Sequence, residues 1–332
     1  MGKINYLLKR IRKMNYKQMF KAIEDISKET GKSKLLIFND IIYCGFKYQA
    51  GYSDYKLFKM YDMNNKERAT VITRGINNSI VKKYNDKNYI ECFENKVLFN
   101  KLFNKYLNRD WLYLKEASLE DFKKFLKGKK EIIVKPLALS CGKNIEKIKL
   151  ALETPEDLYQ RLLNSGQTLV EEVATQNEEL NKIYPYAVNT LRVVTLKGKV
   201  VCIFLRIGNN GNVVDNFNHG GMVVPVEVDT GKINYPALDK NGQVYDIHPM
   251  TKAKIKGAII PKIAEVKKLC EDASLVVPQI SYVAWDVCLG ENKPCLIEGN
   301  DFPGHDVYQL PVHRSNNIGL LPEFEKIMKE DK

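Results

Sequence analysis

The sequence lacks the cysteine patterns that mark disulfide frameworks and zinc sites. Its seven cysteines are scattered and odd in number, and no two of them are spaced as Cys-x-x-Cys. It also has no apolar run approaching the roughly 18 to 20 residues that a membrane-spanning helix needs. We therefore expect a cytoplasmic protein in a reducing environment, without a disulfide scaffold or a structural zinc ion.

Other functional signatures are absent as well. There is no phosphate loop of the form G-x-x-x-x-G-K-S/T, no internal repeat, no low-complexity tract and no nucleic-acid-binding signature. No Ser-His-Asp or Cys-His set is recognisable, so we expect no protein nucleophile. Leu7 and Leu8 alone do not make the apolar stretch of a signal peptide, and Tyr6 stands where myristoylation requires Ser or Thr.

The length and the net charge limit the classes of protein and of binding partner that remain. With 332 residues the chain can bury a large core and divide into two or three sub-domains. Hydrophobic residues make up 44% and charged residues 28%, which is too apolar for a disordered chain. The formal charge of +12 favours an anionic partner: a nucleotide, a nucleic acid, an acidic sugar polymer or a membrane surface. Nucleic acid is the least favoured, because the basic residues are dispersed.

The first 26 residues predict a basic amphipathic helix. Apolar residues from Ile4 to Ile26 keep the period of one helix face, and lysines and arginines occupy much of the rest. This helix could lie on an anionic membrane or polymer. The alternative, which we favour, is that its apolar stripe packs against the body of the protein.

After a mainly helical start, strands and helices alternate. Predicted helices cover residues 32–48, 66–84, 95–107, 118–128, 154–166 and 258–273, with a short one near the C-terminus; predicted strands cover 110–114, 131–136 and 168–173, with hairpins over 189–211 and 280–300. Ser118 with Asp121 and Thr154 before a proline are helix start signals. The predicted class is α+β.

The last hairpin gathers oxygen ligands. Its strands read YVAWDVCL and KPCLIEGN, so Glu298 and Asn300 share a sheet face and the pairing can bring Asp286 opposite them. Two carboxylates and an amide oxygen are ligands that Mg²⁺ takes when phosphate and water complete its shell. The alternative is a polar sheet face exposed to water, with no ligand.

A second group predicts nucleotide contacts. Lys135 ends the strand EIIVKP and precedes the loop SCGKN, where Ser140 and Gly142 would let backbone N–H groups approach a phosphate. A surface Lys-Pro is the alternative. The strand TLVEEV, which ends at Val173, could offer backbone groups to an adenine, with Glu171 or Glu172 near the base amino group.

Two arginines predict an anion between them. Arg192 and Arg206 lie on the two arms of one hairpin, in a region without matched acids. Guanidinium groups suit forked contacts to phosphate or carboxylate. Each of them taken singly is also compatible with an ordinary surface arginine.

The order of these pieces resembles the ATP-grasp superfamily. The stretch of R-V-x-x-x-x-G-K-V-V with a following arginine and N-x-H-G-G resembles the branch of glutathione synthetase and the ribosomal-protein glutamate ligases. VNTLRVVTL, DNFNHGG and IEGNDFPGHD are closer still to the sugar-transfer-associated ATP-grasp proteins found with polysaccharide biosynthesis. The resemblance covers residues 95–325 and implies an ATP-grasp fold with a helical N-terminal region.

The resemblance also implies roles for single residues, with ATP and Mg²⁺ as cofactors. It implies Lys135 on the ATP phosphates, Glu171 and Glu172 at the adenine hinge, Asp286, Glu298 and Asn300 on magnesium, and Arg206 as an acyl-phosphate or γ-phosphate clamp. Where family members often have Asp-Lys, this chain has Asn95-Lys96, so Lys96 is the candidate for a further nucleotide lysine. The ribose contact implied past the hinge is Gln176, Glu178 or Glu179.

The four histidines divide into two pairs. His219 lies in the glycine-flanked loop NFNHGG and His305 follows the metal strand, so both are candidates for substrate contact. For His248 and His313 a structural role is expected, because no spacing suggests zinc.

The predicted function is an ATP-dependent carboxylate-amine ligase that works through an acyl phosphate. By family resemblance it joins an amino acid or amine to a carboxylated sugar precursor of a polysaccharide, in the cytoplasm or at the inner membrane face. The alternatives are an ATP-grasp kinase for a hydroxyl group and a non-catalytic glycan- or membrane-binding adaptor. The expected divisions are 1–94 for substrate or membrane contact, 95–175 for ATP, and 176–332 for magnesium and substrate.

Overall fold

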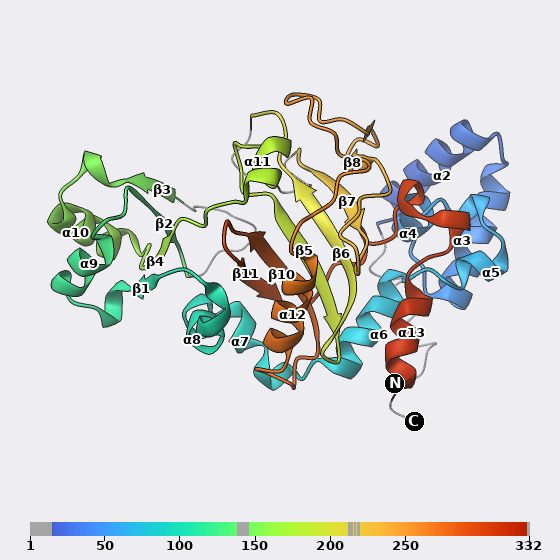
Figure 1. The fold of residues 1–332 in the computed structure, drawn as a ribbon. Coiled ribbons are helices and arrows are strands. Elements are labelled where there is room, and N and C mark those ends of the chain that lie inside the picture. The colour runs from blue at the N-terminus through green and yellow to red at the C-terminus, as the bar shows by residue number, and fades with distance from the viewer. Residues whose placement is uncertain (1–14, 138–145, 212–214, 216, 218–219, 331–332) are drawn as a thin grey trace. The chain divides into compact units, whose positions relative to one another are not determined.

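The computed structural model describes residues 15–137, 146–211, 215, 217 and 220–330 (Figure 1). It divides the chain into two units. The helical unit combines the N-terminal segment up to Lys83 with the segment from Gly304 onward, and the sheet unit runs from Tyr84 to Pro303. The C-terminal segment thus joins the N-terminal helices, although its sequence suggested a place in a C-terminal sub-domain. The predicted division of tasks among three segments stays a prediction.

The helical unit buries the apolar stripe expected of its first helix. Its helices are α2 (Tyr16–Thr30), α3 (Lys34–Tyr48), α4 (Tyr52–Leu57), α5 (Asn65–Arg68), α6 (Arg74–Tyr84) and α13 (Leu321–Lys329). Asn15 caps α2, and Gly31 ends it with φ 71°. Met19, Ile23 and Ile26 pack into one core with residues of α3 and α4. The favoured packing against the body therefore holds for α2, whereas residues 1–14 lie outside the described part of the chain.

The returning C-terminal segment is fixed by one buried glutamine. Gln309 accepts a hydrogen bond from the backbone N–H of Ile72 at 3.0 Å and donates one to the carbonyl of Ile72 at 2.6 Å. The predicted helix over 66–84 is broken here into α5 and α6, because the buried residues between them pair with this segment instead of continuing a helix.

The first sheet of the sheet unit is antiparallel throughout. Its strands, in the order β1-β4-β2-β3, are β1 (Trp111–Tyr113), β4 (Leu169–Glu172), β2 (Glu131–Lys135) and β3 (Glu146–Lys149). Helices α9 (Leu119–Leu126) and α10 (Pro155–Ser165) share its core. The predicted capping box of Ser118 with Asp121 and the cap by Thr154 are confirmed. Strand β3 was not predicted.

Within the described residues, the second sheet has seven strands in the order β11-β10-β5-β6-β7-β8-β9. They are β5 (Thr190–Leu196), β6 (Lys199–Ile207), β7 (Met222–Val226), β8 (Ala237–Asp239), β9 (Val244–Tyr245), β10 (Tyr282–Leu289) and β11 (Pro294–Asn300). Both predicted hairpins are confirmed. The β5–β6 turn is made by Lys197 and Gly198 at φ 52° and 78°, the left-handed conformations that a tight two-residue hairpin turn requires.

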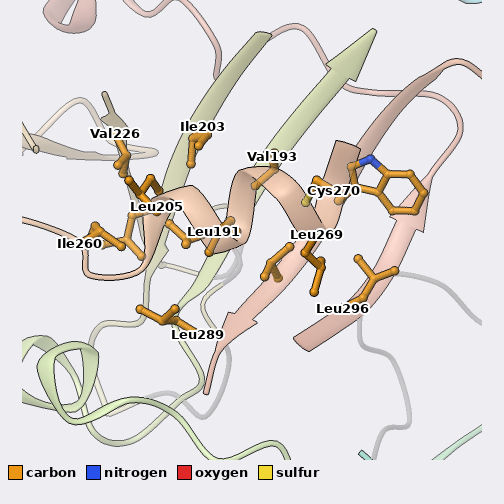
Figure 2. Packing of buried hydrophobic residues seen from close by; sticks show 14 of the residues in the cluster. Leu191, Val193, Ile203, Leu205, Val226, Ile260, Leu269, Cys270, Leu289 and Leu296 are labelled. Atoms are coloured by element: carbon orange, nitrogen blue, oxygen red, sulfur yellow. The ribbon is translucent and has the colours of Figure 1, made fainter. Parts of the chain in front are cut away.

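Helices cover one face of this second sheet. Leu269 and Cys270 of α12 (Ile263–Ser274) lie over the odd-numbered residues of β5 and β6, such as Val193 and Leu205 (Figure 2). Next to them, Trp285 of β10 packs against aromatic rings from α7 (Glu91–Glu94) and α8 (Lys96–Leu107). The even-numbered residues are left to form the site described below. No helix in the described ranges is long and apolar enough to cross a membrane.

Candidate active site

Charged residues form a row across four strands of the second sheet. The strand register places Glu298 of β11 opposite Asp286 of β10, and Asp286 opposite Arg192 of β5. Arg192 in turn faces Phe204 of β6, so Arg206 stands at the diagonal position on the same face. Alternation of side chains places Asp286, Arg192 and Arg206 on one face, and a shift of the β10–β11 register between Asp286 and Val287 brings Glu298 to the same face.

Asp286 is the buried centre of the row. Its Oδ1 accepts a hydrogen bond from Nε of Arg192 at 2.5 Å, and its Oδ2 accepts from Nη2 of Arg192 at 3.0 Å and from Nη1 of Arg206 at 3.2 Å. Burial alone would raise the pKa of Asp286, but the two guanidinium groups outweigh it and lower the pKa. Asp286 is therefore an anion at neutral pH.

These contacts correct the expectation that the two arginines lack matched acids. Their partner Asp286 comes from a strand 94 residues away from Arg192 and 80 residues away from Arg206. Arg206 also pairs with Asp215 at 2.8 Å. The acids were missed because the pairing of β10 with β5, and not local sequence, brings them to the arginines.

Glu298 extends the row toward solvent. The residue is exposed near the end of β11, but its carboxyl group lies within the row, where the register sets it opposite Asp286. Desolvation in the crowded row and the charge of Asp286 raise the pKa of Glu298, and the charges of Lys135 and Arg192 oppose that shift only in part. Asn300 is exposed two residues further along β11, and its Oδ1 accepts from the N–H of Phe302 at 2.9 Å.

This donor set fits a magnesium ion. A divalent cation beside Glu298 would offset the negative charge of Asp286, which raises the pKa of Glu298. Among the described residues no cluster of three or more His, Cys, Asp or Glu side chains is arranged for a metal. The protein would therefore supply Asp286, Glu298 and the amide oxygen of Asn300, and phosphate and water oxygens would complete the shell, as is usual for Mg²⁺.

On the first sheet, Lys135 is held by a buried carboxylate. Its Nζ lies 2.7 Å from Oε2 of Glu171. The same carboxylate accepts from Nε and Nη2 of Arg109 at 3.1 and 2.9 Å and from Nδ2 of Asn100 at 3.1 Å. Burial would raise the pKa of Glu171, yet Lys135 and Arg109 outweigh it and lower the pKa to about 2. All of these partners are internal, and the expected place of Glu171 beside an adenine stays a prediction.

Lys96 adds a second cation near Lys135. Asn95 caps α8 by accepting from the N–H groups of Val97 and Leu98 at 3.1 Å, so Lys96 is the first residue of the helix. Its Nζ donates to the carbonyl of Pro136 at 2.6 Å. Burial and the charge of Lys135 lower the pKa of Lys96, while Glu298 opposes the shift. The two predicted nucleotide lysines and a predicted metal carboxylate are thus brought within electrostatic range of one another.

Three other residues predicted to contact the nucleotide are half-buried or exposed and lie outside the charged row. Glu172 is half-buried and accepts from the N–H of Asp110 at 3.1 Å, and Val173 is half-buried directly after β4. Glu178 is exposed in the first turn of α11 (Glu178–Ile183), 3.6 Å from Lys182. Their nucleotide roles stay predictions.

Gln176, one candidate for the ribose, is buried and engaged by the protein. Its Nε2 donates to Oδ1 of Asn181 at 2.8 Å, and its Oε1 accepts from the N–H of Asn189 at 2.5 Å. These contacts give it a structural role at the entry to β5. The loop residues Ser140 and Gly142 and the substrate candidate His219 lie outside the described residues.

The other histidines are internal. His248 is fully buried, with Nε2 3.0 Å from the carbonyl of Gly208 and Nδ1 accepting from the N–H of Met250 at 3.2 Å, which fits the expected structural role. Burial lowers the pKa of His248. His305 belongs to the helical unit, where Nε2 lies 2.8 Å from Oδ1 of Asp54, and His313 is buried in the same unit.

Sequence reasoning missed three residues that support the site, two beside Glu171 on the first sheet and one beside Arg206 in the row. Asn100 and Arg109 hold Glu171, as described above. Asp215 is buried and accepts from the N–H and the hydroxyl of Thr190 at 2.9 and 2.5 Å as well as from Arg206. Asp215 opens the motif DNFNHGG, so a signal for it was present, whereas nothing local marks Asn100 or Arg109.

Comparison with known proteins gives one family and a set of distant folds. The profile of the sugar-transfer associated ATP-grasp family matches residues 75–329. No curated protein matches the chain. Similar solved structures include the ATP-grasp ligase PsnB with minimal precursor, Mg and ADP (14% identity, 80% of this chain, 68% of that chain, TM-score 0.44) and PsnB with its precursor peptide PsnA2 and AMPPNP (14%, 74%, 62%, 0.45).

A third is the D-alanine–D-alanine ligase of Bacillus anthracis, at 13% identity over 77% of each chain with a TM-score of 0.42. This chain spans less than two thirds of the PsnB chain in the precursor complex. With TM-scores below 0.5, these likenesses say nothing about what this chain binds.

Proposed function

This chain belongs to the sugar-transfer associated ATP-grasp family, and we propose that it is an ATP-dependent carboxylate-amine ligase with ATP and Mg²⁺ as cofactors. The observation that carries the proposal is the meeting of cations and paired carboxylates in one site. Lys96 and Lys135 approach Glu298, and Glu298 faces Asp286 with its two arginines. Ordinary ion pairs lie at the surface and are isolated, whereas here acidic and basic side chains alternate along a row with a buried centre, as is common at functional sites.

The two lysines would bind the phosphates of ATP. Lys135 carries three donors, of which one goes to Glu171, so the ammonium can also donate to phosphate oxygens. Arg109 and Asn100 hold Glu171 in place, and Glu171 holds Lys135. A cation positioned in this way by a buried acid costs little reorganisation when an anion arrives.

Asp286, Glu298 and Asn300 would hold Mg²⁺, which when bound offsets negative charge on the transferred phosphoryl group. Arg206 would stabilise the same group from the other side of the row. Its guanidinium is fixed by Asp286 at 3.2 Å and by Asp215 at 2.8 Å, and Arg192 is fixed by Asp286. Such pre-oriented charges act most strongly where charge develops in the transition state.

The proposed reaction has two steps. A substrate carboxylate attacks the γ-phosphorus of ATP, which releases ADP and forms an acyl phosphate. An amine then attacks the acyl carbon, phosphate leaves, and an amide is formed. No side chain of the protein becomes bonded to substrate, so the residues of the row bind, orient and offset charge. His219 stays a proposed substrate contact, together with its loop.

For the substrates we propose a carboxylated sugar precursor of a polysaccharide and an amino acid or other amine. The association of the family with sugar transfer and the formal charge of +12 support an acidic sugar substrate. We propose that the chain acts in the cytoplasm.

The test is ADP release from a panel of amino acids crossed with uronic-acid sugars, with mass detection of the product. A ligase gives an amide and needs both substrates, and Glu298→Gln should abolish the signal. A phosphorylated sugar formed without any amine would replace the ligase by a kinase. Failure to bind Mg-ATP would instead favour a non-catalytic adaptor.

We also propose contact of the helical unit with an anionic membrane. The apolar stripe of α2 is buried, so the support lies in α3, where Leu35, Leu36 and Phe46 are 68%, 66% and 61% exposed. Lys34 and Lys47 stand at the two ends of that helix. An apolar face flanked by lysines suits an anionic membrane interface.

Sedimentation with phosphatidylglycerol vesicles tests this contact. A double variant with Leu35→Glu and Phe46→Glu should stay in the supernatant, while the wild type and Leu152→Glu, which changes a leucine that is 77% exposed in the sheet unit, sediment. Equal sedimentation of all three proteins would remove the membrane from the proposal.

A further inference from the structure

Two cysteines face each other next to the metal carboxylates. Cys288 of β10 stands directly opposite Cys295 of β11 in the strand register, and the thiol of Cys288 lies 4.0 Å from the carbonyl oxygen of Thr175. Cys288 follows Asp286 by two residues, so both side chains leave β10 on the same face. Both thiols are free, with exposures of 0% for Cys288 and 5% for Cys295.

The pairing brings the two Cα atoms within the range that a disulfide spans. Residues directly opposite in an antiparallel pair have Cα atoms roughly 4.5 to 5.5 Å apart, and disulfides form across roughly 4.4 to 6.8 Å. Within the described strands this is the only register pair made of two cysteines; Cys202, for example, stands opposite Val194. A bond between Cys288 and Cys295 therefore needs side-chain rotation and a small strand shift, but no change of register.

The pair is connected to both halves of the site. On one side, Cys288 lies two residues from Asp286, at the point where the β10–β11 register shifts. On the other side, the guanidinium of Arg109 donates a hydrogen bond to the carbonyl of Leu296, the residue after Cys295, and its charge acts on the Cys295 thiol. The same guanidinium holds Glu171 at 2.9 Å. A movement of the two sulfurs would therefore displace both Asp286 and, through Arg109, the carboxylate of Glu171 that holds Lys135.

We propose that Cys288 and Cys295 are an oxidative modification site, at which a reversible cross-strand disulfide switches off the ATP site. The thiolate of one cysteine attacks a low-molecular-weight disulfide, which gives a mixed disulfide and one free small thiol. The second cysteine then attacks the protein sulfur of that bond and releases the second small thiol. Two protein thiols thus lose two electrons and two protons, and the small disulfide is reduced to two thiols.

The switch follows from a mismatch of distances. Opposite Cβ atoms in a sheet lie roughly 4.5 to 5.5 Å apart, whereas a disulfide holds them at about 3.8 Å. Closing the bond draws β10 and β11 together by about 1 Å, two residues from Asp286, and a displacement of about 1 Å can cost on the order of 10²-fold in rate. The hydrogen bond from Arg109 to the carbonyl of Leu296, next to Cys295, is disturbed as well.

The same mismatch makes the bond easy to reverse. A strained disulfide is more readily reduced than a relaxed one, so the pair stays as thiols in a reducing cytoplasm and closes only when the thiol pool is oxidised. The effect on turnover rests on the proposed ATP-dependent function. The formation of the bond does not.

The experiment treats the full chain with oxidised glutathione without denaturant, followed by peptide mapping without reduction. We expect a linked pair of peptides containing Cys288 and Cys295, a loss of two hydrogen atoms by mass, and a fall of at least about tenfold in ADP release that dithiothreitol restores. Cys288→Ala should form no link and keep the same ratio of activity with and without oxidant. Cys270→Ser, which changes a buried cysteine on α12, should respond like the wild type.

Two results would overturn the proposal. One is the absence of the linked peptides when a solvent-accessible reporter thiol in the same tube is fully oxidised. The other is a linked protein whose affinity for a fluorescent ATP analogue and whose ADP release equal those of the reduced protein. If the reduced chain binds the analogue but makes no amide, the ligase proposal fails. The disulfide proposal is then still tested by the peptide map and by the difference in affinity for the analogue between the reduced and the linked protein.

Discussion

The ammonium group of Lys135 lies 2.7 Å from the carboxylate of Glu171, on strands that are neighbours in the four-stranded sheet. The register sets Lys135 opposite Leu169, so Glu171 is at the diagonal position on the same face. Both side chains are nearly inaccessible, at 13% and 4%. The cation predicted to meet ATP is thus oriented from behind by an acid that the solvent barely reaches, and the strength of that anchor can be measured.

Replacing that acid should destabilise the protein. Glu171→Gln leaves Lys135 and Arg109 without their shared counter-ion, and breaking one side of a buried ion pair is strongly unfavourable. The fall of the pKa of Glu171 from 4.5 to about 2 corresponds to about 3 kcal/mol at neutral pH. Urea unfolding should show that loss, whereas Glu178→Gln, in an exposed first turn, should change stability by less than about 0.5 kcal/mol.

The stability that the ion pair of Lys135 and Glu171 contributes should fall in acid. Because the folded pKa of Glu171 is lowered, its stabilisation is complete above 4.5 and is lost as the pH falls from 4.5 toward about 2. The stability difference between the wild type and Glu171→Gln should therefore be constant at neutral pH and shrink below pH 4.5. A difference that stays constant down to pH 3 would contradict the ionised anchor.

Removing the lysines should weaken nucleotide binding. Lys135→Ala and Lys96→Ala each delete a charged donor, and losing a hydrogen bond to a charged group costs roughly 1.5 to 3 kcal/mol, which is roughly a 10- to 100-fold rise in the Kd for Mg-ATP. Isothermal titration measures this value. Lys101→Ala is the matched control, because Lys101 also lies on α8 but pairs with Glu116 at the surface. Equal affinity of all three variants would take the lysines out of the site.

Glu298→Gln should stop turnover and spare the fold. The side chain is exposed, so its replacement leaves no buried charge unpaired, while a neutral amide ligates Mg²⁺ less strongly than a carboxylate. We expect kcat to fall by on the order of 10²-fold or more and the requirement for Mg²⁺ to rise, with an unchanged thermal midpoint. Glu291→Gln, in the exposed β10–β11 turn, should keep full activity. Wild-type turnover by Glu298→Gln would remove the metal assignment.

Short-range sequence signals predicted individual helices and hairpins, whereas the pairing of distant strands determines which side chains meet in the site. The capping residues Ser118 and Thr154 and the turn at Lys197 and Gly198 act within a few residues, so the sequence alone located α9, α10 and the β5–β6 hairpin. The hairpin itself was predictable, but the facing of Asp286 and Glu298 depends on a shift of register between Asp286 and Val287, without which Asp286 would stand opposite Ile297.

The partners of the site residues were not predictable in this way. Arg109 meets Glu171 only because β1, which begins two residues later, pairs with β4, and Asp286 meets Arg192 only because β10 lies between β11 and β5. Such contacts join residues 62 and 94 positions apart, where no periodicity or motif connects them. The break between α5 and α6 has the same origin, since Gln309 arrives there from 237 positions away.

The buried stripe of α2 changes what a truncation can test. Ile26 is 0% exposed in the core of the helical unit, so deleting residues 1–26 would remove core packing along with any membrane contact. Ile26→Ala should lower the free energy of unfolding by roughly 2 to 5 kcal/mol. Phe20→Ala, at a position that is 58% exposed on the same helix, should cost far less. Equal losses in thermal unfolding would mean that the stripe is not packed as described.

His248 should make the sheet unit sensitive to mild acid. Its ring is fully buried and stacks on Tyr184 with the ring centroids 5.2 Å apart, and burial lowers its pKa below the ordinary 6.5. Above pH 7 both the folded and the unfolded chain carry a neutral imidazole, so no stability is lost. As the pH falls through 6.5, the unfolded chain takes up a proton that the folded chain refuses, and stability declines until the folded pKa is reached.

The thermal midpoint of the wild type should therefore fall more steeply between pH 7 and 5 than that of His248→Gln. Glutamine cannot titrate, but its amide can still donate to the carbonyl of Gly208, which now lies 3.0 Å from Nε2. The variant will start from a lower midpoint because the ring stacking is lost, so the slope with pH is the quantity to compare. Most carboxylates titrate below this window, which isolates the histidine. Parallel slopes for the two proteins would show that His248 is protonated equally in both states.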